Sequence, residues 1–280
     1  MPRYSKLAAV SALAIAACTT LPETAPSYGI YATADPTAVE RGRYIVHGPA
    51  HCVSCHGDDL AGGRAFELGP LGTVVAPNIT SDPAAGIGAL SDDTVVRALR
   101  YGISRDGRLL VPFMSFSDLA DADLRAIVSY LRTVPPVSRP APPRRLSLLG
   151  RVGVSVFLKR EGPSALPPAR IAPARTEEYG RYLAHTLANC AGCHTQRSKL
   201  TGGFVGPALA GGLRFDEPEG TFVAPDLRPT ARLVSEERFI ERFRLRGSGS
   251  GGSPMPWQTY ARMTDTDLGA IYRYLRTLSE

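Results

Sequence analysis

Apolar residues recur at helical spacing in two stretches of the chain, and candidate N-cap residues precede both. The first stretch has Leu124, Ile127, Val128 and Leu131 after the candidate caps Ser117 and Asp118. The second has Leu268, Ile271 and Leu275 after the candidate caps Thr264 and Asp265. Such spacing lines one face of a helix, so each stretch predicts a helix that packs against a core. Elsewhere glycine- and proline-rich segments dominate without strand-like alternation, which favours an all-α fold.

The same sequence markers occur twice along the chain, in the same order. Gly-Arg-Tyr at 42–44 returns at 180–182, and Gly-Thr-Val-Val-Ala-Pro at 72–77 returns as Gly-Thr-Phe-Val-Ala-Pro at 220–225. The helix signature Asp-Ala-Asp-Leu at 121–124 returns as Asp-Thr-Asp-Leu at 265–268. A repeat of this length indicates two copies of one domain. We place the copies at residues 36–137 and 174–280, joined by a proline-rich linker at 138–173.

Each copy contains the pattern Cys-x-x-Cys-His, which comprises Cys52, Cys55 and His56 in the first copy and Cys190, Cys193 and His194 in the second. Two thiols one helical turn apart can bond to the two vinyl groups of a haem, while the adjacent imidazole reaches the iron. A disulfide, a zinc site and a thioredoxin-like redox pair fit less well. No βαβ pattern surrounds either pair, and a zinc site would not require both histidines. The sequence therefore predicts two covalently bound c-type haems.

The second axial ligand of each iron decides what the haem can do. An iron that is held on both sides transfers electrons, whereas an iron with one open side can bind or activate a small molecule. Met114 and Met255 occupy matching loop positions, each before the final helix of its copy. We therefore expect His56 with Met114, and His194 with Met255, as iron ligands rather than two core methionines. Met263 stands at the start of the last helix, where a core-facing side chain is expected.

Three further histidines lie within ten residues upstream of a haem motif, namely His47, His51 and His185. From there they would have difficulty reaching the opposite face of the same haem. We expect them at the surface or beside the haem propionates.

The first eighteen residues are typical of an export signal. Arg3 and Lys6 precede an apolar run at 7–17 that is too short to span a bilayer. Cys18 directly follows small residues, as the acylated cysteine of a bacterial lipoprotein does. We favour lipidation of Cys18 over ordinary cleavage nearby, and expect a periplasmic protein anchored to the membrane by this lipid.

Residues 144–160 in the linker are apolar with basic ends. Such a segment suits either an anionic membrane surface or a strap that packs across the two domains and buries its apolar residues there. We favour the strap, because Arg151 and two glycines interrupt a clean membrane-facing side.

These motifs together resemble class I cytochrome c domains. The residues that carry the resemblance are the two Cys-x-x-Cys-His motifs, Ala-Pro-Asn-Ile-Thr at 76–80, Met-Pro-Trp at 255–257 and the Asp-Leu…Tyr-Leu-Arg helix of each copy. The whole chain resembles a dihaem cytochrome c and is similar to the cytochrome subunits of bacterial periplasmic alcohol, gluconate and related dehydrogenases. The resemblance implies two tandem domains, each a few helices wrapped round a covalent haem.

The resemblance also implies two structural details. The first and last helices of each copy should cross at a small residue against an aromatic one, Gly42 against Tyr130 and Gly180 against Tyr274. A prolyl carbonyl after each haem motif should accept a hydrogen bond from the ligand histidine and so hold it in place. The expected carbonyls are those of Pro70 and Pro207.

The formal net charge of +6 comes almost entirely from arginine. For an exported haem protein we expect no nucleic-acid partner, and the charge suits neutralisation of propionates or docking to an acidic redox protein. We expect an electron carrier with no catalytic residues, which takes electrons from a periplasmic dehydrogenase and passes them to a cytochrome, an oxidase or a quinone-linked acceptor. The alternative is a dihaem enzyme, such as a peroxidase or a thiosulfate-oxidising cytochrome, with one iron open to substrate.

Overall fold

The computed structural model describes residues 28–110, 114, 116–157, 162–198, 203–217, 220–249 and 252–278, with the backbone alone for 154–157. The predicted leader, with Cys18, lies outside the described residues. The first half contains α1 (Pro36–His47), α2 (Val53–His56), β1 (Ala65–Glu67), the 3₁₀ turn η1 (Gly69–Leu71), β2 (Gly72–Val75), α3 (Asp92–Tyr101) and α4 (Asp121–Thr133). The linker contains β3 (Arg145–Leu146) and α5 (Leu148–Phe157).

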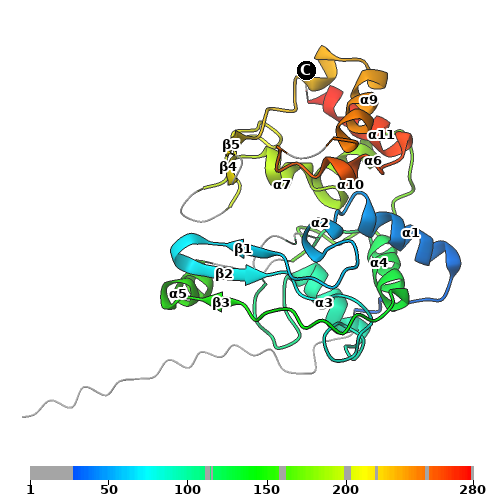
Figure 1. Cartoon of the computed structure of the whole chain (residues 1–280). Helices are drawn as coiled ribbons and strands as arrows, with labels where there is room; N and C mark the ends of the chain where they lie inside the picture. The colour runs from blue at the N-terminus through cyan, green and yellow to red at the C-terminus, as the bar shows by residue number, and fades with distance from the viewer. Residues whose placement is uncertain are drawn as a thin grey trace, which may run out of the picture.

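The second half repeats the order of the main helices and strands, with two added short helices, α8 and α10. It contains α6 (Glu177–Tyr182), the π-helical turn η2 (Leu183–Leu187), α7 (Cys190–His194), β4 (Arg214–Glu217), β5 (Gly220–Val223), α8 (Thr230–Leu233), α9 (Glu236–Gly247), α10 (Trp257–Tyr260) and α11 (Asp265–Thr277). Figure 1 shows the helices of the second half above those of the first. Within the described part of the chain, no helix is both long enough and apolar enough to span a bilayer.

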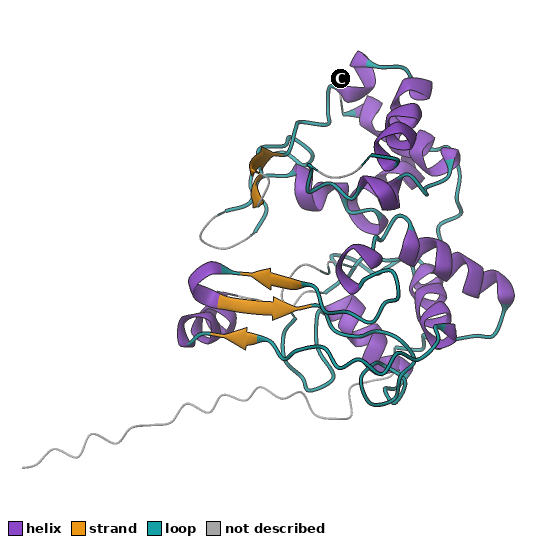
Figure 2. Ribbon diagram, viewed as in Figure 1, coloured by secondary structure: helices purple, strands orange, loops and turns teal. Residues whose placement is uncertain are grey.

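Helices predominate, but small antiparallel sheets are also present, so the all-α prediction is wrong in this respect (Figure 2). In the first half β1 pairs with β2, and β3 from the linker adds to the other edge of β2. In the second half β4 pairs with β5. Each strand is only two to four residues long. Segments this short give almost no period-two signal, which is why the sequence pattern did not predict them.

The first and last helices of each half cross at a glycine. A Cβ on Gly42 of α1 would clash with the carbonyl oxygen of Ala126 and lie 2.7 Å from the Cβ of Tyr130 in α4. In the second half, a Cβ on Gly180 of α6 would meet Ala270 and Tyr274 of α11 in the same way. The crossing implied by the resemblance is therefore confirmed in both halves.

A side chain at this crossing should destabilise the protein. Gly42→Ala is expected to lower the free energy of unfolding by about 3 kcal/mol, because the methyl group forces α1 away from α4. Gly153 is a matched control, since it also lies in a helix but a Cβ there meets nothing within 4 Å. Gly153→Ala should be neutral or stabilise by up to about 1 kcal/mol. Denaturant unfolding followed by circular dichroism measures both, and a Gly42→Ala variant as stable as the parent would contradict the close crossing.

The two final helices begin differently. α11 begins at the predicted cap Thr264, whose hydroxyl accepts a hydrogen bond from the N–H of Asp267 at 3.1 Å. α4 has Ala120 as its N-cap, so the predicted caps Ser117 and Asp118 are wrong. The N–H groups of Asp121 and Ala122 donate instead to carbonyls of linker residues 168 and 169, each at 3.0 Å. Linker backbone thus replaces a capping side chain, an arrangement that no local sequence signal reveals.

The linker is fastened to the first half. The side-chain amide of Asn78 donates to the carbonyls of Val137 and Arg139, and the hydroxyl of Ser147 donates to the carbonyl of Pro70 at 2.7 Å.

The predicted strap should have buried its apolar residues, but three of them are largely exposed, Leu148 at 79%, Leu149 at 59% and Val152 at 52%. That prediction is wrong for these three residues. The reason is that Gly150 faces η1, where a Cβ would clash with the carbonyl of Leu71, and this close approach turns the leucines outward.

The two halves share one apolar core. The cluster includes Ile45 and Leu124 from the first half and Leu183 and Leu268 from the second. In Figure 1, α6 and α11 of the second half lie above α1 and α4 of the first. Because burial of apolar side chains is the main favourable contribution to folding, this continuous core joins the halves into one body.

Hydrogen bonds across the contact between the halves are reciprocal. The hydroxyl of Tyr44 donates to Asp267 and accepts from the N–H of Thr264 at 3.0 Å. The hydroxyl of Tyr182 donates to Asp123 at 2.8 Å and accepts from the N–H of Ala120 at 3.2 Å. The tyrosine of each Gly-Arg-Tyr marker thus binds the Asp-x-Asp-Leu marker of the other copy. The repeated markers therefore specify how the two halves join.

Candidate functional site

The six haem-motif residues lie on one-turn helices or directly before them. Cys52 is the N-cap of α2, which also carries Cys55 and ends at His56, and the N–H of His56 donates to the carbonyl of Cys52 at 2.9 Å. α7 spans the second motif from Cys190 to His194. The residue before each first cysteine, His51 or Asn189, has a left-handed backbone with φ of 40° or 48°. The same strained turn therefore directs the chain into each motif.

A prolyl carbonyl holds each motif histidine, but not the one implied by the resemblance. Nδ1 of His56 lies 2.7 Å from the carbonyl oxygen of Pro77, and Nδ1 of His194 lies 2.9 Å from that of Pro225. The expected Pro70 carbonyl accepts from Ser147 instead, and the Pro207 carbonyl accepts from the N–H of Ala210 at 3.4 Å. The prediction of Pro70 and Pro207 is therefore wrong. The repeated Ala-Pro at 76–77 and 224–225 was the signal that could have identified the correct carbonyls.

Backbone hydrogen bonds bring each of these prolines to its histidine. In the first half the N–H of Gly62 donates to the carbonyl of His56 at 2.8 Å, and the N–H of Gly63 donates to that of Ala76 at 2.9 Å. Gly211 and Gly212 make the same two bonds in the second half, to His194 and Ala224. A Cβ on Gly62 would lie 2.5 Å from the backbone of Ala76 and Pro77. Glycine is therefore required for this close approach.

This geometry fixes the protonation of both histidines. A carbonyl oxygen only accepts, so Nδ1 must donate its proton to it, and Nε2 is left with a lone pair. Burial lowers the pKa of His56 and of His194, which keeps both rings neutral. A neutral imidazole with a free Nε2 and a hydrogen-bonded Nδ1 is the form that ligates iron in haem proteins.

The cysteine environments bear on the alternatives to haem. The four motif cysteines are free thiols rather than disulfides. Burial raises the pKa of Cys52 and of Cys190 to about 12, so both are protonated at neutral pH. Reactive redox pairs lower a cysteine pKa to generate thiolate, which is the opposite trend. The environment therefore suits cysteines that end as thioethers.

The methionines occupy different environments. Met114 and Met255 are half-buried and pack against the shared apolar core. Residues 111–113 and 115, which flank Met114, lie outside the described residues. Met263 is 2% exposed and belongs to the core itself, as the sequence predicts. The pairing of Met114 with His56 and of Met255 with His194 stays a prediction.

An unsatisfied donor lies beside Met255. The indole Nε1 of Trp257 is buried and has no hydrogen-bond partner among the residues that the structure describes. A buried N–H without an acceptor is unfavourable, so a missing acceptor is expected there. A haem propionate has the right chemistry to be that acceptor. This donor, the histidine geometry and the protonated thiols all fit a covalently bound haem.

The other histidines form specific contacts rather than lying loose at the surface. Nε2 of His47 lies 2.7 Å from the hydroxyl of Tyr130, and His185 makes the equivalent contact with Tyr274 at 2.7 Å. The ring of His51 packs edge-on against Tyr260, with 5.5 Å between ring centroids. The buried hydroxyl of Tyr260 donates to the carbonyl of Ala188 at 2.7 Å. Tyr260 therefore links the residue before Cys52 to the segment before Cys190.

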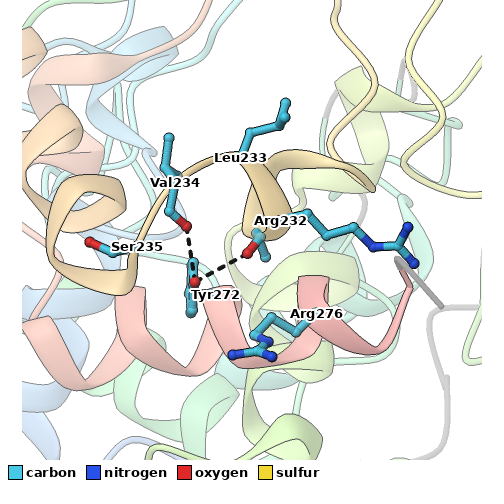
Figure 3. A pocket seen from close by; sticks show the side chains of 7 residues that line it. Arg232, Leu233, Val234, Ser235, Tyr272 and Arg276 are labelled. Carbon is cyan, nitrogen blue, oxygen red and sulfur yellow. Dashed lines mark hydrogen bonds between the residues drawn. The ribbon is translucent and has the colours of Figure 1, made fainter.

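A hollow in the second half lies between α8 and α11. Its lining comprises Ala231, Arg232, Leu233, Val234, Ser235, Tyr272 and Arg276. The hydroxyl of Tyr272 lies 3.1 Å and 3.0 Å from the carbonyl oxygens of Ala231 and Val234, which it binds. In Figure 3 the guanidinium groups of Arg232 and Arg276 point to different sides, so they do not converge on one ligand. We assign no chemistry to this hollow.

Comparison with known proteins identifies the family. Residues 37–131 match the family described as cytochrome c oxidase, cbb3-type, subunit III. The chain is 33% identical over 275 residues to the alcohol dehydrogenase (quinone) cytochrome c subunit of Gluconacetobacter polyoxogenes, covering 88% of this chain and 57% of that protein. It is 31% identical over 272 residues to the fructose dehydrogenase cytochrome subunit of Gluconobacter japonicus, covering 88% of this chain and 54% of that protein.

These two relatives are longer proteins, and the chain spans little more than half of their length. A relative of similar size is the diheme cytochrome c-type protein of Cereibacter sphaeroides, which is 30% identical over 245 residues. That match covers 80% of this chain and 81% of the relative. The two equivalent histidine sites agree with this match to a diheme cytochrome c. The chain belongs to the cytochrome c family.

Proposed function

We propose that this chain binds two c-type haems and carries electrons from a periplasmic dehydrogenase to a respiratory acceptor, which is a cytochrome, an oxidase or a quinone-linked protein. The observation that carries the proposal is the duplication of the histidine site. Each half has a Cys-x-x-Cys-His helix whose buried histidine donates Nδ1–H to a prolyl carbonyl. Two such histidine sites in one chain support the proposal of two one-electron centres.

Each set of residues has a distinct role in the proposed sites. The cysteines hold the haem covalently, while the prolyl carbonyls of Pro77 and Pro225 orient the histidines. When bound, the haem supplies one-electron redox chemistry at its iron. Met114 and Met255 would close the second axial position, which favours electron transfer over binding of a substrate at the iron. His56 and His194 are buried, at 4% and 7% exposed, and such burial would keep solvent reorganisation small when the iron changes its charge.

The names of the relatives support a dehydrogenase as the electron donor. Two of them are cytochrome subunits of alcohol and fructose dehydrogenases. The positive net charge of this chain, +6, suits docking to an acidic redox partner. Docking of that kind is sensitive to ionic strength, so reduction by the donor should slow as salt is added.

Haem stoichiometry and the optical spectrum test the proposed function. Mass spectrometry after acid-acetone treatment should show two haem additions, and the Cys190→Ala, Cys193→Ala variant should show one. The oxidised parent should show the charge-transfer band at the red edge of the spectrum that reports methionine bound to ferric iron. Zero or one haem in the parent would contradict the dihaem proposal. A high-spin haem that binds peroxide readily would favour the enzyme alternative instead.

We also propose that the protein is held in the periplasm by a lipid on Cys18. Cys18→Ala should move the protein from the membrane fraction to the soluble periplasmic fraction while both haems stay attached. Cell fractionation with haem staining measures this. A parent protein that is wholly soluble, with an N-terminus other than Cys18, would show that ordinary cleavage takes place.

A further inference from the structure

The outer face of α5 is a contiguous apolar surface. Leu148, Leu149 and Val152 are 79%, 59% and 52% exposed, and their spacing places them together on one side of the helix. Single exposed leucines are ordinary on protein surfaces, but three adjacent large apolar side chains on one helix are not. We call these three residues the α5 face.

The rest of the fold holds the α5 face outward. Gly150 presses against the carbonyl of Leu71, so the opposite side of the helix rests on η1. The hydroxyl of Ser147 donates to the carbonyl of Pro70 and accepts from the N–H of Gly150 at 3.0 Å. In Figure 1 α5 lies at the end of the sheet that is far from α2. Helix α5 therefore lies away from the helix of the first haem motif.

The charges beside the α5 face are positive. Residues 144–157 contain three arginines and no acidic residue. Arg145 precedes the helix and Arg151 lies within it, and both side chains are exposed. The nearby sheet brings one acidic side chain, Glu67, whose carboxylate accepts a hydrogen bond from the hydroxyl of Thr73 at 2.8 Å. Exposed apolar side chains flanked by arginines are typical of helices that lie in the interface of an anionic membrane.

We propose that the α5 face binds an anionic lipid surface, with Leu148, Leu149 and Val152 entering the interface and Arg145 and Arg151 meeting lipid phosphates. A protein partner could also cover apolar side chains. The arginines and the lack of acidic residues in 144–157 favour phospholipid, because each cation near an anionic surface adds to the binding. This contact would exist independently of a lipid on Cys18 and would fix which side of the protein faces the membrane.

Vesicle binding by the haem-loaded full chain carrying Cys18→Ala tests the proposal, since no acyl chain can then anchor the protein. It should sediment with vesicles of phosphatidylcholine mixed with phosphatidylglycerol, and bind more weakly to phosphatidylcholine alone or at high salt. Combined Leu148→Ser, Leu149→Ser and Val152→Ser should lower the partition coefficient at least about tenfold. A matched control is Leu166→Ser with Val223→Ser, two apolar residues that are 95% and 61% exposed outside α5. The control should bind as the parent does.

A second variant tests lipid binding by α5 if the serine substitutions unfold this helix. Arg145→Gln with Arg151→Gln keeps the apolar face and should lower binding to phosphatidylglycerol vesicles about tenfold. The proposal is overturned if the parent does not bind these vesicles, or if the control loses as much binding as the α5 variants. Haem content and the methionine band are recorded on the same samples, so failure of the electron-carrier proposal would be seen separately.

Discussion

Met255→Ala is expected to open the second-half iron and leave the first-half iron unchanged. If Met255 is the axial ligand opposite His194, its loss frees one coordination position and removes a ligand that raises the reduction potential. The variant should bind carbon monoxide at one haem, lose part of the red-edge charge-transfer band, and show one potential lowered by on the order of 100 mV. Spectroelectrochemistry and carbon monoxide difference spectra measure these effects. Met114→Ala should do the same at the first-half iron.

The chain provides a matched control for the methionine variants. Met263 lies eight residues after Met255 but is fully packed in the core. Met263→Leu conserves most of its volume and should leave both potentials and both spectra unchanged. A parent protein that already binds carbon monoxide at both haems would contradict methionine ligation. An effect of Met263→Leu on one potential would point to Met263 as the ligand in place of Met255.

The parts of the fold that follow from the sequence are those with a repeated local signal. The Cys-x-x-Cys-His helices and the helices at 121–133 and 265–277 lie where the markers place them, and the glycine crossings at Gly42 and Gly180 lie where the resemblance to cytochrome c implies. Each depends on a pattern within one turn of helix or on a steric requirement that only glycine meets. Because both copies repeat the pattern, each supports the interpretation of the other.

The parts that the sequence did not predict depend on contacts between distant segments. The carbonyl that holds His56 belongs to Pro77, twenty-one residues later, and only the repeat of Ala-Pro at 224–225 distinguishes it in sequence from the other prolyl carbonyl of that loop. The first turn of α4 is capped by linker carbonyls nearly fifty residues away. The strand β3 comes from the linker and depends on β2 for its hydrogen bonds. Pairings of this kind are set by tertiary packing, which overrides local propensity.

The contact between the halves shows how the repeat is used twice. Within each half, the Gly-Arg-Tyr glycine allows the first helix to cross the last. Two residues later, the tyrosine of the same marker reaches the last helix of the other half. Burial raises the pKa of Tyr44 and of Tyr182, so both hydroxyls stay protonated and donate to the aspartates. One marker therefore specifies both the fold of a half and its attachment to the other half.

The two tyrosine–aspartate contacts that join the halves are not equally strong. Asp123 accepts from Tyr182 and also pairs with Arg41, whose Nε lies 2.9 Å from its carboxylate. The side chains of Arg41 and Asp123 are only 22% and 7% exposed, so this ion pair is largely removed from water. Asp267 accepts a hydrogen bond from Tyr44. The residue of the second copy that corresponds to Arg41 is Tyr179, so a neutral side chain replaces the arginine there. Loss of Asp123 should therefore be the more damaging of the two.

Asp123→Ala is expected to lower the thermal unfolding midpoint by about 10 °C, because it leaves the half-buried Arg41 guanidinium and the Tyr182 hydroxyl without their acceptor. Asp267→Ala should lower it by about 5 °C, since the donors that lose their acceptor, the hydroxyls of Tyr44 and Tyr179, are neutral. Asp216→Ala is the control, because its pair with Arg214 is exposed at 69% and 65% and should contribute almost nothing. Calorimetry should show one transition in the parent and two separated transitions when Asp123 and Asp267 are both replaced. Midpoints for the three single variants that agree within about 1 °C would mean that these hydrogen bonds do not hold the halves together.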